Sequence, residues 1–181
     1  SYINLRTAGG KHPYNPESTG DNGGGKLLAG FDGSWDGWTV KGTAFGTTPP
    51  QGATPGQQPL VNHSSAGLLN TYLDASTGQG SDATTGTATS PTFTIDSAYL
   101  NLLMGGGNNP RPEGGADGGS GVSVVELIVD GKVVRSATGR NLEELNWQSW
   151  DVSDLKGKYA QIVVTDTATG PCGHLPLSLI P

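Results

Sequence analysis

The chain has 181 residues, of which 30 are glycine, while 33% are hydrophobic and 14% are charged. This length suits one domain with a buried core. The net charge is −6 and no lysine or arginine cluster occurs, which excludes the basic surface that nucleic acids and anionic membranes require. No apolar run is long enough to span a membrane. Low lysine with abundant threonine and glycine is typical of a secreted or cell-surface bacterial protein.

Short runs of β-branched and aromatic residues, separated by glycine and proline, predict strands joined by many turns. Asp130-Gly131 predicts a two-residue hairpin, because Asp-Gly readily adopts positive φ angles. A single helical turn is expected at 141–145, and long loops at 47–58 and 105–121. The predicted fold is all-β, a jelly-roll β-sandwich with long glycine-rich loops. Its expected strands, in chain order, are 38–40, 68–72, 85–89, 91–95, 98–104, 122–129, 132–137, 148–152 and 159–165.

The sequence divides into an N-terminal extension, 1–27, and a β-sandwich, 28–181. Residues 1–13 align with 98–110 without a gap, each a strand-like run followed by glycines. Either the extension is a partial repeat of 98–121, or two strand-plus-glycine segments are alike by chance.

A catalytic centre is not expected. The histidines His12, His63 and His174 lie far apart and none has metal-ligand spacing. Neither a nucleophile elbow nor a phosphate-binding glycine loop occurs. Adjacent acids such as Glu143 and Glu144 usually lie on a solvated face, which leaves a glycosidase pair as a remote alternative. The lone Cys172 cannot form a disulfide within the chain and is expected to be a small buried residue.

Eight blocks of the sequence follow one another in a recognisable order. The first contains Asp-Gly-Ser-Trp-Asp-Gly-Trp at 32–38, and the last ends with Gly173-His174; the blocks are 31–46, 69–72, 85–93, 99–107, 127–139, 147–153, 155–158 and 166–174. Together they resemble the β-sandwich module attached to bacterial levanases and related fructan hydrolases. The resemblance implies a jelly-roll module that binds fructan, particularly the terminal fructose units of levan.

A furanose site needs hydrogen-bonding groups that converge on neighbouring hydroxyls beside an apolar wall. Arginine and carboxylates suit this because charge-assisted hydrogen bonds are strong. Trp147 and Trp150 are three residues apart on a strand, so one should face the core, and Trp147 is predicted to be the exposed sugar platform. The candidate ligand-binding residues are Asn70, Tyr72, Asp82, Asn108, Asn109, Asp130, Arg135, Glu143, Trp147, Asp166 and His174.

Several of these candidates also have a structural explanation. Asp130 suits the hairpin turn, and Arg135 could be solvated or paired with Glu143 or Asp166. Asp166 and His174 could form an internal hydrogen bond.

No cofactor is expected to be required, but the resemblance suggests that a structural calcium ion is bound. Jelly-roll binding modules often hold Ca²⁺ between an N-terminal and a C-terminal acid, through oxygen ligands. Asp32 stands at the first position, whereas Ser178 replaces the second acid and Cys172 replaces a tryptophan. Calcium at Asp32, with backbone carbonyls as further ligands, is therefore an open hypothesis.

The sequence thus predicts a non-catalytic module that binds fructan and directs an attached glycoside hydrolase to its polysaccharide. One alternative is a structural sandwich that packs against a catalytic propeller and binds no ligand. Another is an adhesin-type domain for other glycans. A large exposed apolar face would favour the first alternative, and a flat aromatic platform the second.

Overall fold

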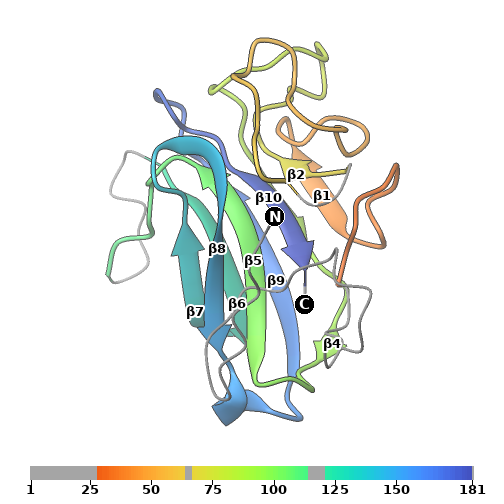
Figure 1. Cartoon of the computed structure of the whole chain (residues 1–181), viewed down its shortest axis with the longest axis vertical. Coiled ribbons are helices and arrows are strands. Elements are labelled where there is room, and N and C mark those ends of the chain that lie inside the picture. The colour runs from red at the N-terminus through yellow and green to blue at the C-terminus, as the bar shows by residue number, and fades with distance from the viewer. Residues whose placement is uncertain (1–27, 64–66, 114–120, 181) are drawn as a thin grey trace.

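The computed structural model describes residues 28–63, 67–113 and 121–180. They form two antiparallel sheets packed face to face (Figure 1). The prediction of an all-β sandwich with long loops is confirmed. The extension 1–27 and its relation to 98–121 lie outside the described residues. None of the described helical structure is long and apolar enough to cross a membrane.

The larger sheet has the strand order β1-β3-β9-β6-β7, with β4 also paired to β9, and the smaller sheet has the order β2-β10-β5-β8. The strands are β1 Thr39–Gly42, β2 Leu69–Asn70, β3 Gly86–Thr89, β4 Phe93–Thr94, β5 Tyr99–Gly106, β6 Ser123–Val129, β7 Lys132–Thr138, β8 Leu142–Asp151, β9 Tyr159–Asp166 and β10 Pro176–Ile180.

The core lies between the two sheets and follows the period-two pattern of the strands. Ile162 and Val164 on β9 face Leu102 on β5 across the interior, and all three are fully buried or nearly so. The residues that alternate with them on β9, namely Gln161, Val163 and Thr165, are half-buried and lie on the other face of the sheet. Trp38 belongs to this core, and so does Trp150, as predicted.

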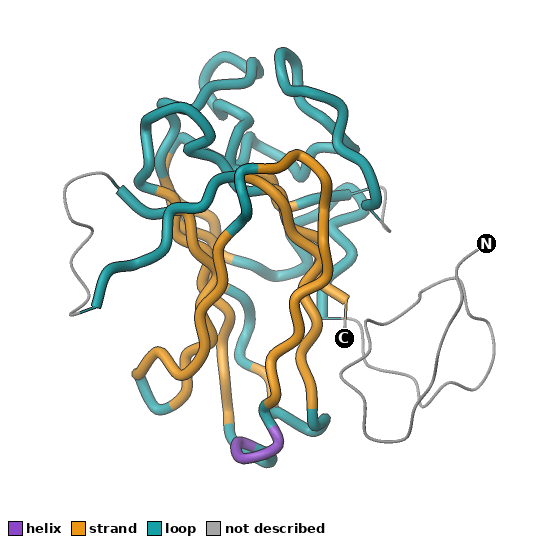
Figure 2. The backbone as a smooth tube through the Cα atoms, turned by 60° about the vertical axis from the view of Figure 1, so that its left-hand side comes forward, coloured by secondary structure: helices purple, strands orange, loops and turns teal. Residues whose placement is uncertain are grey.

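The predicted hairpin joins β6 to β7. Asp130 and Gly131 both have positive φ, 52° and 72°, as a tight turn of the type I′ kind requires. The long loops gather at the other end of the sandwich (Figure 2).

Two local predictions are wrong. The expected helical turn at 141–145 is the start of β8, because Leu142 pairs with Gly106 on β5, and the described helical structure is a short 3₁₀ turn at Ser153–Leu155. Cross-strand pairing decides this segment over local propensity. The strand Pro176–Ile180 was not predicted, although proline is tolerated at the first position of a strand.

The loop between β9 and β10 also corrects an expectation. Cys172 is exposed and has a φ of 58°, so it is not a buried apolar residue. Beside this loop, the glycine run at the end of β5 allows close backbone contact. Gly107 N donates to His174 O at 2.9 Å, and a Cβ on Gly107 would overlap the carbonyl of Cys172. The glycines here serve close approach of two backbones.

Gly107→Ala should therefore lower the free energy of unfolding by about 1–3 kcal/mol, because backbone atoms must move to admit the methyl group. Gly170→Ala is the matched control, since a Cβ there meets nothing within 4 Å. Urea unfolding of both variants tests this, and equal stability of the two would contradict the close-approach explanation.

Candidate functional site

A histidine between two acids forms the centre of the candidate site. His174 Nδ1 lies 2.7 Å from Asp82 Oδ1, and His174 Nε2 lies 2.8 Å from Glu143 Oε1. Carboxylate oxygens accept hydrogen bonds, so both contacts are satisfied when both ring nitrogens carry a proton. His174 is then an imidazolium clamped by two carboxylates, and we call these three residues the acid–histidine triad.

The surroundings of His174 favour its charged form. Burial alone would lower the pKa of His174, but the hydrogen bonds with Glu143 and Asp82 outweigh it and raise the pKa above its ordinary value of 6.5. The triad carries two carboxylates for one imidazolium, which leaves one net negative charge.

The three members of the triad come from separate segments. Asp82 lies in the loop between β2 and β3, and Glu143 is near the start of β8. His174 lies in the loop that leads into β10. The backbone fixes their positions, because Gly173 N donates to Asp82 Oδ1 at 3.1 Å. Leu175 N donates to the hydroxyl of Thr71 at 2.7 Å, which holds the chain on the other side of His174.

A chain of amides extends the triad. Gln57 Nε2 donates to Glu143 Oε2 at 3.1 Å, and Asn70 Nδ2 donates to Gln57 Oε1 at 2.8 Å. Asn70 Oδ1 in turn accepts from Tyr72 N at 3.1 Å. The Tyr72 ring lies over His174, with the ring centroids 4.5 Å apart, a distance at which an imidazolium is attracted to an aromatic face.

Asp166 lies behind the triad, at the end of β9 in the other sheet. It is 1% exposed, and its Oδ1 accepts hydrogen bonds from Ser123 Oγ at 3.2 Å and Ala168 N at 3.1 Å. Burial raises the pKa of Asp166 to about 7, against the opposing effects of hydrogen bonds and of the charge on His174. Ser123 Oγ also bonds the carbonyl of Gly173, so this polar group links the two sheets next to His174.

The triad is only partly covered. The His174 side chain is 7% exposed, whereas those of Glu143 and Asp82 are 20% and 31% exposed. Asp82 Oδ2 has no hydrogen-bond partner among the described residues. The outer edge of the triad therefore offers fixed acceptor oxygens beside an aromatic ring.

The structure brings together five of the predicted residues and places a sixth behind them. Asp82, Glu143 and His174 form the triad. Asn70 and Tyr72 adjoin it, and Asp166 lies beneath it.

Asp130 and Arg135 do not join this group. Asp130 lies in the β6–β7 hairpin, where it pairs with Lys158 at 3.2 Å. Arg135 donates to the carbonyl of Asp151 and to Asp154 Oδ1, at the far end of β8 from Glu143. That strand has ten residues and spans about 30 Å. The expectation that Arg135 pairs with Glu143 or Asp166 is wrong, and a binding role for Asp130 or Arg135 stays a prediction.

The glycine-loop asparagines make structural contacts. Asn108 N donates to Asn141 Oδ1 at 2.7 Å, and Asn109 Nδ2 donates to the carbonyl of Cys172 at 3.0 Å. These bonds fasten the loop to its neighbours. Whether either side chain also contacts a ligand stays a prediction.

Trp147 faces away from Trp150, as predicted, but it is not a free platform. It is half-buried on the outer face of the smaller sheet, where it packs against a small apolar cluster. The cluster consists of Leu60, Leu68, Leu103 and Leu145.

A calcium site finds little support around Asp32. Asp32 is exposed and its Oδ1 accepts a hydrogen bond from Gly67 N at 3.2 Å. The nearby Asp36 uses its carboxylate to bind the backbone N–H groups of Gly30 and Phe31. The described residues contain no group of three or more His, Cys, Asp or Glu that could hold a metal ion. The acid-rich oxygen set that calcium prefers is thus not assembled among them, and calcium stays a prediction.

Sequence reasoning missed Gln57. It lies in the proline- and glycine-rich loop 47–58, which has no strand or helix period to assign a direction to any side chain. The only signal was the length of that loop, which is typical of a functional segment.

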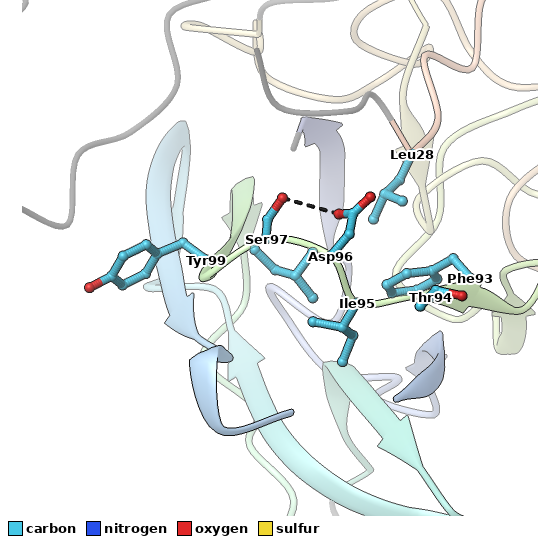
Figure 3. A pocket seen from close by; sticks show the side chains of 8 residues that line it. Leu28, Phe93, Thr94, Ile95, Asp96, Ser97 and Tyr99 are labelled. Carbon is cyan, nitrogen blue, oxygen red and sulfur yellow. Dashed lines mark hydrogen bonds between the residues drawn. The ribbon is translucent and has the colours of Figure 1, made fainter. Parts of the chain in front are cut away.

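A hollow at the opposite end of β5 lacks convergent polar groups. Two of its polar side chains hydrogen-bond each other, Ser97 Oγ to Asp96 Oδ1 at 3.1 Å, and Tyr99 points away from the rest (Figure 3). It is lined by Leu28, Phe93, Thr94, Ile95, Asp96, Ser97, Tyr99 and Leu100.

Comparison with known proteins gives one sequence relative. No family model matches the chain. Over 144 residues, which are 80% of the chain, it is 38% identical to a protein of Aspergillus rugulosus that carries the provisional name glycosyl hydrolase ecdE. The match covers 18% of that protein, so the chain spans less than a fifth of this relative.

Two solved structures show a distant likeness. The K3 adhesin domain of Lys-gingipain from Porphyromonas gingivalis matches with a TM-score of 0.42 at 9% identity, over 79% of this chain and 88% of that one. The CBM35 from Paenibacillus barcinonensis matches with a TM-score of 0.35 at 14% identity, over 79% and 98%. Both scores are low, and the fold is assigned from the two sheets described above.

Asp166 and His174 should each contribute less to the stability of the chain as the pH rises from 5 to 9. The raised pKa of Asp166 means that its contribution is fully present below its ordinary pKa of 3.8 and is lost as the pH rises to about 7. The contribution of His174 is present below pH 6.5 and is lost as the pH rises through its raised folded-state pKa. Both effects have the same sign.

Urea unfolding between pH 5 and pH 9 measures this dependence. Asp166→Asn should reduce the fall in the free energy of unfolding that occurs below pH 7, by an amount on the order of a few kcal/mol. Asp96→Asn, at an exposed acid far from the triad, should leave it unchanged. A pH dependence that survives in Asp166→Asn would show that this carboxyl is not its source.

Proposed function

We propose that this chain is a non-catalytic module that binds fructan, with the terminal fructose units of levan as its target. In the full-length protein it is attached to a glycoside hydrolase and directs that enzyme to the polysaccharide outside the cell. Two findings support the proposal. The ordered sequence blocks resemble the modules of fructan hydrolases, and the chain is similar to a minor part of a longer protein with a glycosyl hydrolase name.

The observation that carries the proposal is a pair of partly exposed carboxylates, Asp82 and Glu143, that accept hydrogen bonds from the same imidazolium. A sugar hydroxyl can donate to Asp82 Oδ2, and Glu143 can accept from a neighbouring hydroxyl. The C–H face of the sugar ring can pack against the aromatic ring of Tyr72. Because the acids are already fixed by His174, little side-chain freedom is lost on binding, which favours affinity.

The same arrangement favours binding over hydrolysis. A glycosidase needs one carboxylic acid that gives a proton to the leaving group and a second that acts as nucleophile or base. Here one imidazolium donates to both carboxylates, so Asp82 and Glu143 both serve as hydrogen-bond acceptors in this arrangement.

The structural-partner alternative would need a large exposed apolar face. Among the described residues, the exposed large apolar side chains lie singly on different segments, a distribution that is ordinary for a solvated surface. They are Val61, Val133, Leu142 and Tyr159.

Isothermal titration with levan, inulin and fructose, with and without EDTA, tests the proposal. The chain should bind levan, and fructose more weakly. Asp82→Asn and Glu143→Gln should each weaken binding at least about tenfold, since each removes a charged acceptor. Asp96→Asn, at an exposed acid far from the triad, should bind like the unmodified chain. No binding to any of the three sugars, by a chain that is folded, would overturn the proposal.

A further inference from the structure

A four-residue turn in the loop 47–58 contacts one acid of the triad, Glu143, and the segment that leads to the other acid, Asp82. The turn is closed on itself, because Gln57 N donates to Thr54 O at 3.0 Å and Thr54 N donates to Gln57 Oε1 at 3.1 Å. Thr54 is buried. We call Thr54 to Gln57 the clamp turn.

The orientation of the Gln57 amide is determined by its partners. Its Oε1 accepts from Asn70 Nδ2 and from Thr54 N, so this atom must be the oxygen. The nitrogen is then left to donate to Glu143 Oε2. Each oxygen of Glu143 thereby has its own donor, His174 on Oε1 and Gln57 on Oε2.

The clamp turn also fixes the segment that leads to Asp82. Gly80 N donates to the carbonyl of Pro55 at 2.9 Å. Gly80 packs so closely that an added Cβ would overlap the Tyr72 ring and the Pro55 carbonyl. Asp82 follows two residues later, so the position of the turn bears on the aromatic ring and on the second acid.

We propose that Gln57 is a positioning residue that sets ligand affinity and specificity by fixing the Glu143 carboxylate, an inference that rests on the proposed function of this site. With Gln57 in place, Glu143 cannot rotate away from His174, and the two acids keep a constant separation. Hydroxyls with matching spacing are then selected over others. The second N–H of Gln57 has no acceptor among the described residues, which leaves a donor beside the acceptor oxygens.

Two substitutions test this role. Gln57→Ala removes the donor to Glu143, and Gln57→Glu places a second carboxylate against it. Both should weaken levan binding, Gln57→Ala by about tenfold, because a hydrogen bond to a charged group is lost. Gln58→Ala and Gln58→Glu are matched controls at the exposed neighbouring residue and should bind like the unmodified chain.

A second readout needs no ligand. NMR titration of the His174 imidazole should show a higher pKa in Gln57→Glu, because a like charge beside Glu143 favours the protonated ring, and a much smaller change in Gln58→Glu. A mere loss of stability would not produce that shift.

The two readouts separate the inference from the proposed function. If the unmodified chain binds levan and Gln57→Ala binds equally well, the inference is overturned and the function stands. If the unmodified chain binds no fructan, the proposed function fails. The His174 titration then decides alone: a lowered pKa in Gln57→Ala, because Glu143 is no longer held against the ring, supports positioning of Glu143, and an unchanged pKa in that variant overturns it.

Discussion

The two hydrogen bonds of His174, one to Asp82 and one to Glu143, join three segments that are far apart in the chain. Removing His174 would leave two neighbouring carboxylates without the cation they share, whereas removing either acid would leave one nitrogen of a buried ring without its acceptor. The loop before β3, the start of β8 and the segment before β10 therefore hold their positions together. The amide chain through Gln57 and the ring of Tyr72 depend on this same centre.

The backbone makes this arrangement possible at one end of the sandwich. Close contact between the glycines that end β5 and the 172–175 segment brings His174 beside β8. Asp166 reaches the same point from the other sheet and links it to the core. The sheets thus position Glu143 and Asp166, and the loops contribute Asp82, His174 and the surface around them. A binding site built on such fixed groups loses little entropy when a ligand arrives.

Sequence patterns predicted the fold where alternation or turn chemistry is strong. The segment 159–165 is rich in β-branched residues and is β9, and Asp130-Gly131 forms the hairpin. The triad residues were among the candidates because acids and histidine suit hydroxyl recognition. The structure places Arg135 apart from them, beside Asp151 and Asp154, because pairing of strands that are distant in the sequence decides which side chains meet. Gln57 was missed because its loop has no period, and its role arises only from contacts across the fold.

The central claim is that the acid–histidine triad is the surface that binds carbohydrate. Mapping backbone amide NMR shifts during titration with a short levan oligosaccharide tests it most directly. The account predicts that the largest changes lie around 54–57, 70–72, 80–82, 143 and 173–175, with little change at the β6–β7 hairpin. Changes centred on the hairpin or on the glycine loop, with the triad undisturbed, would contradict it.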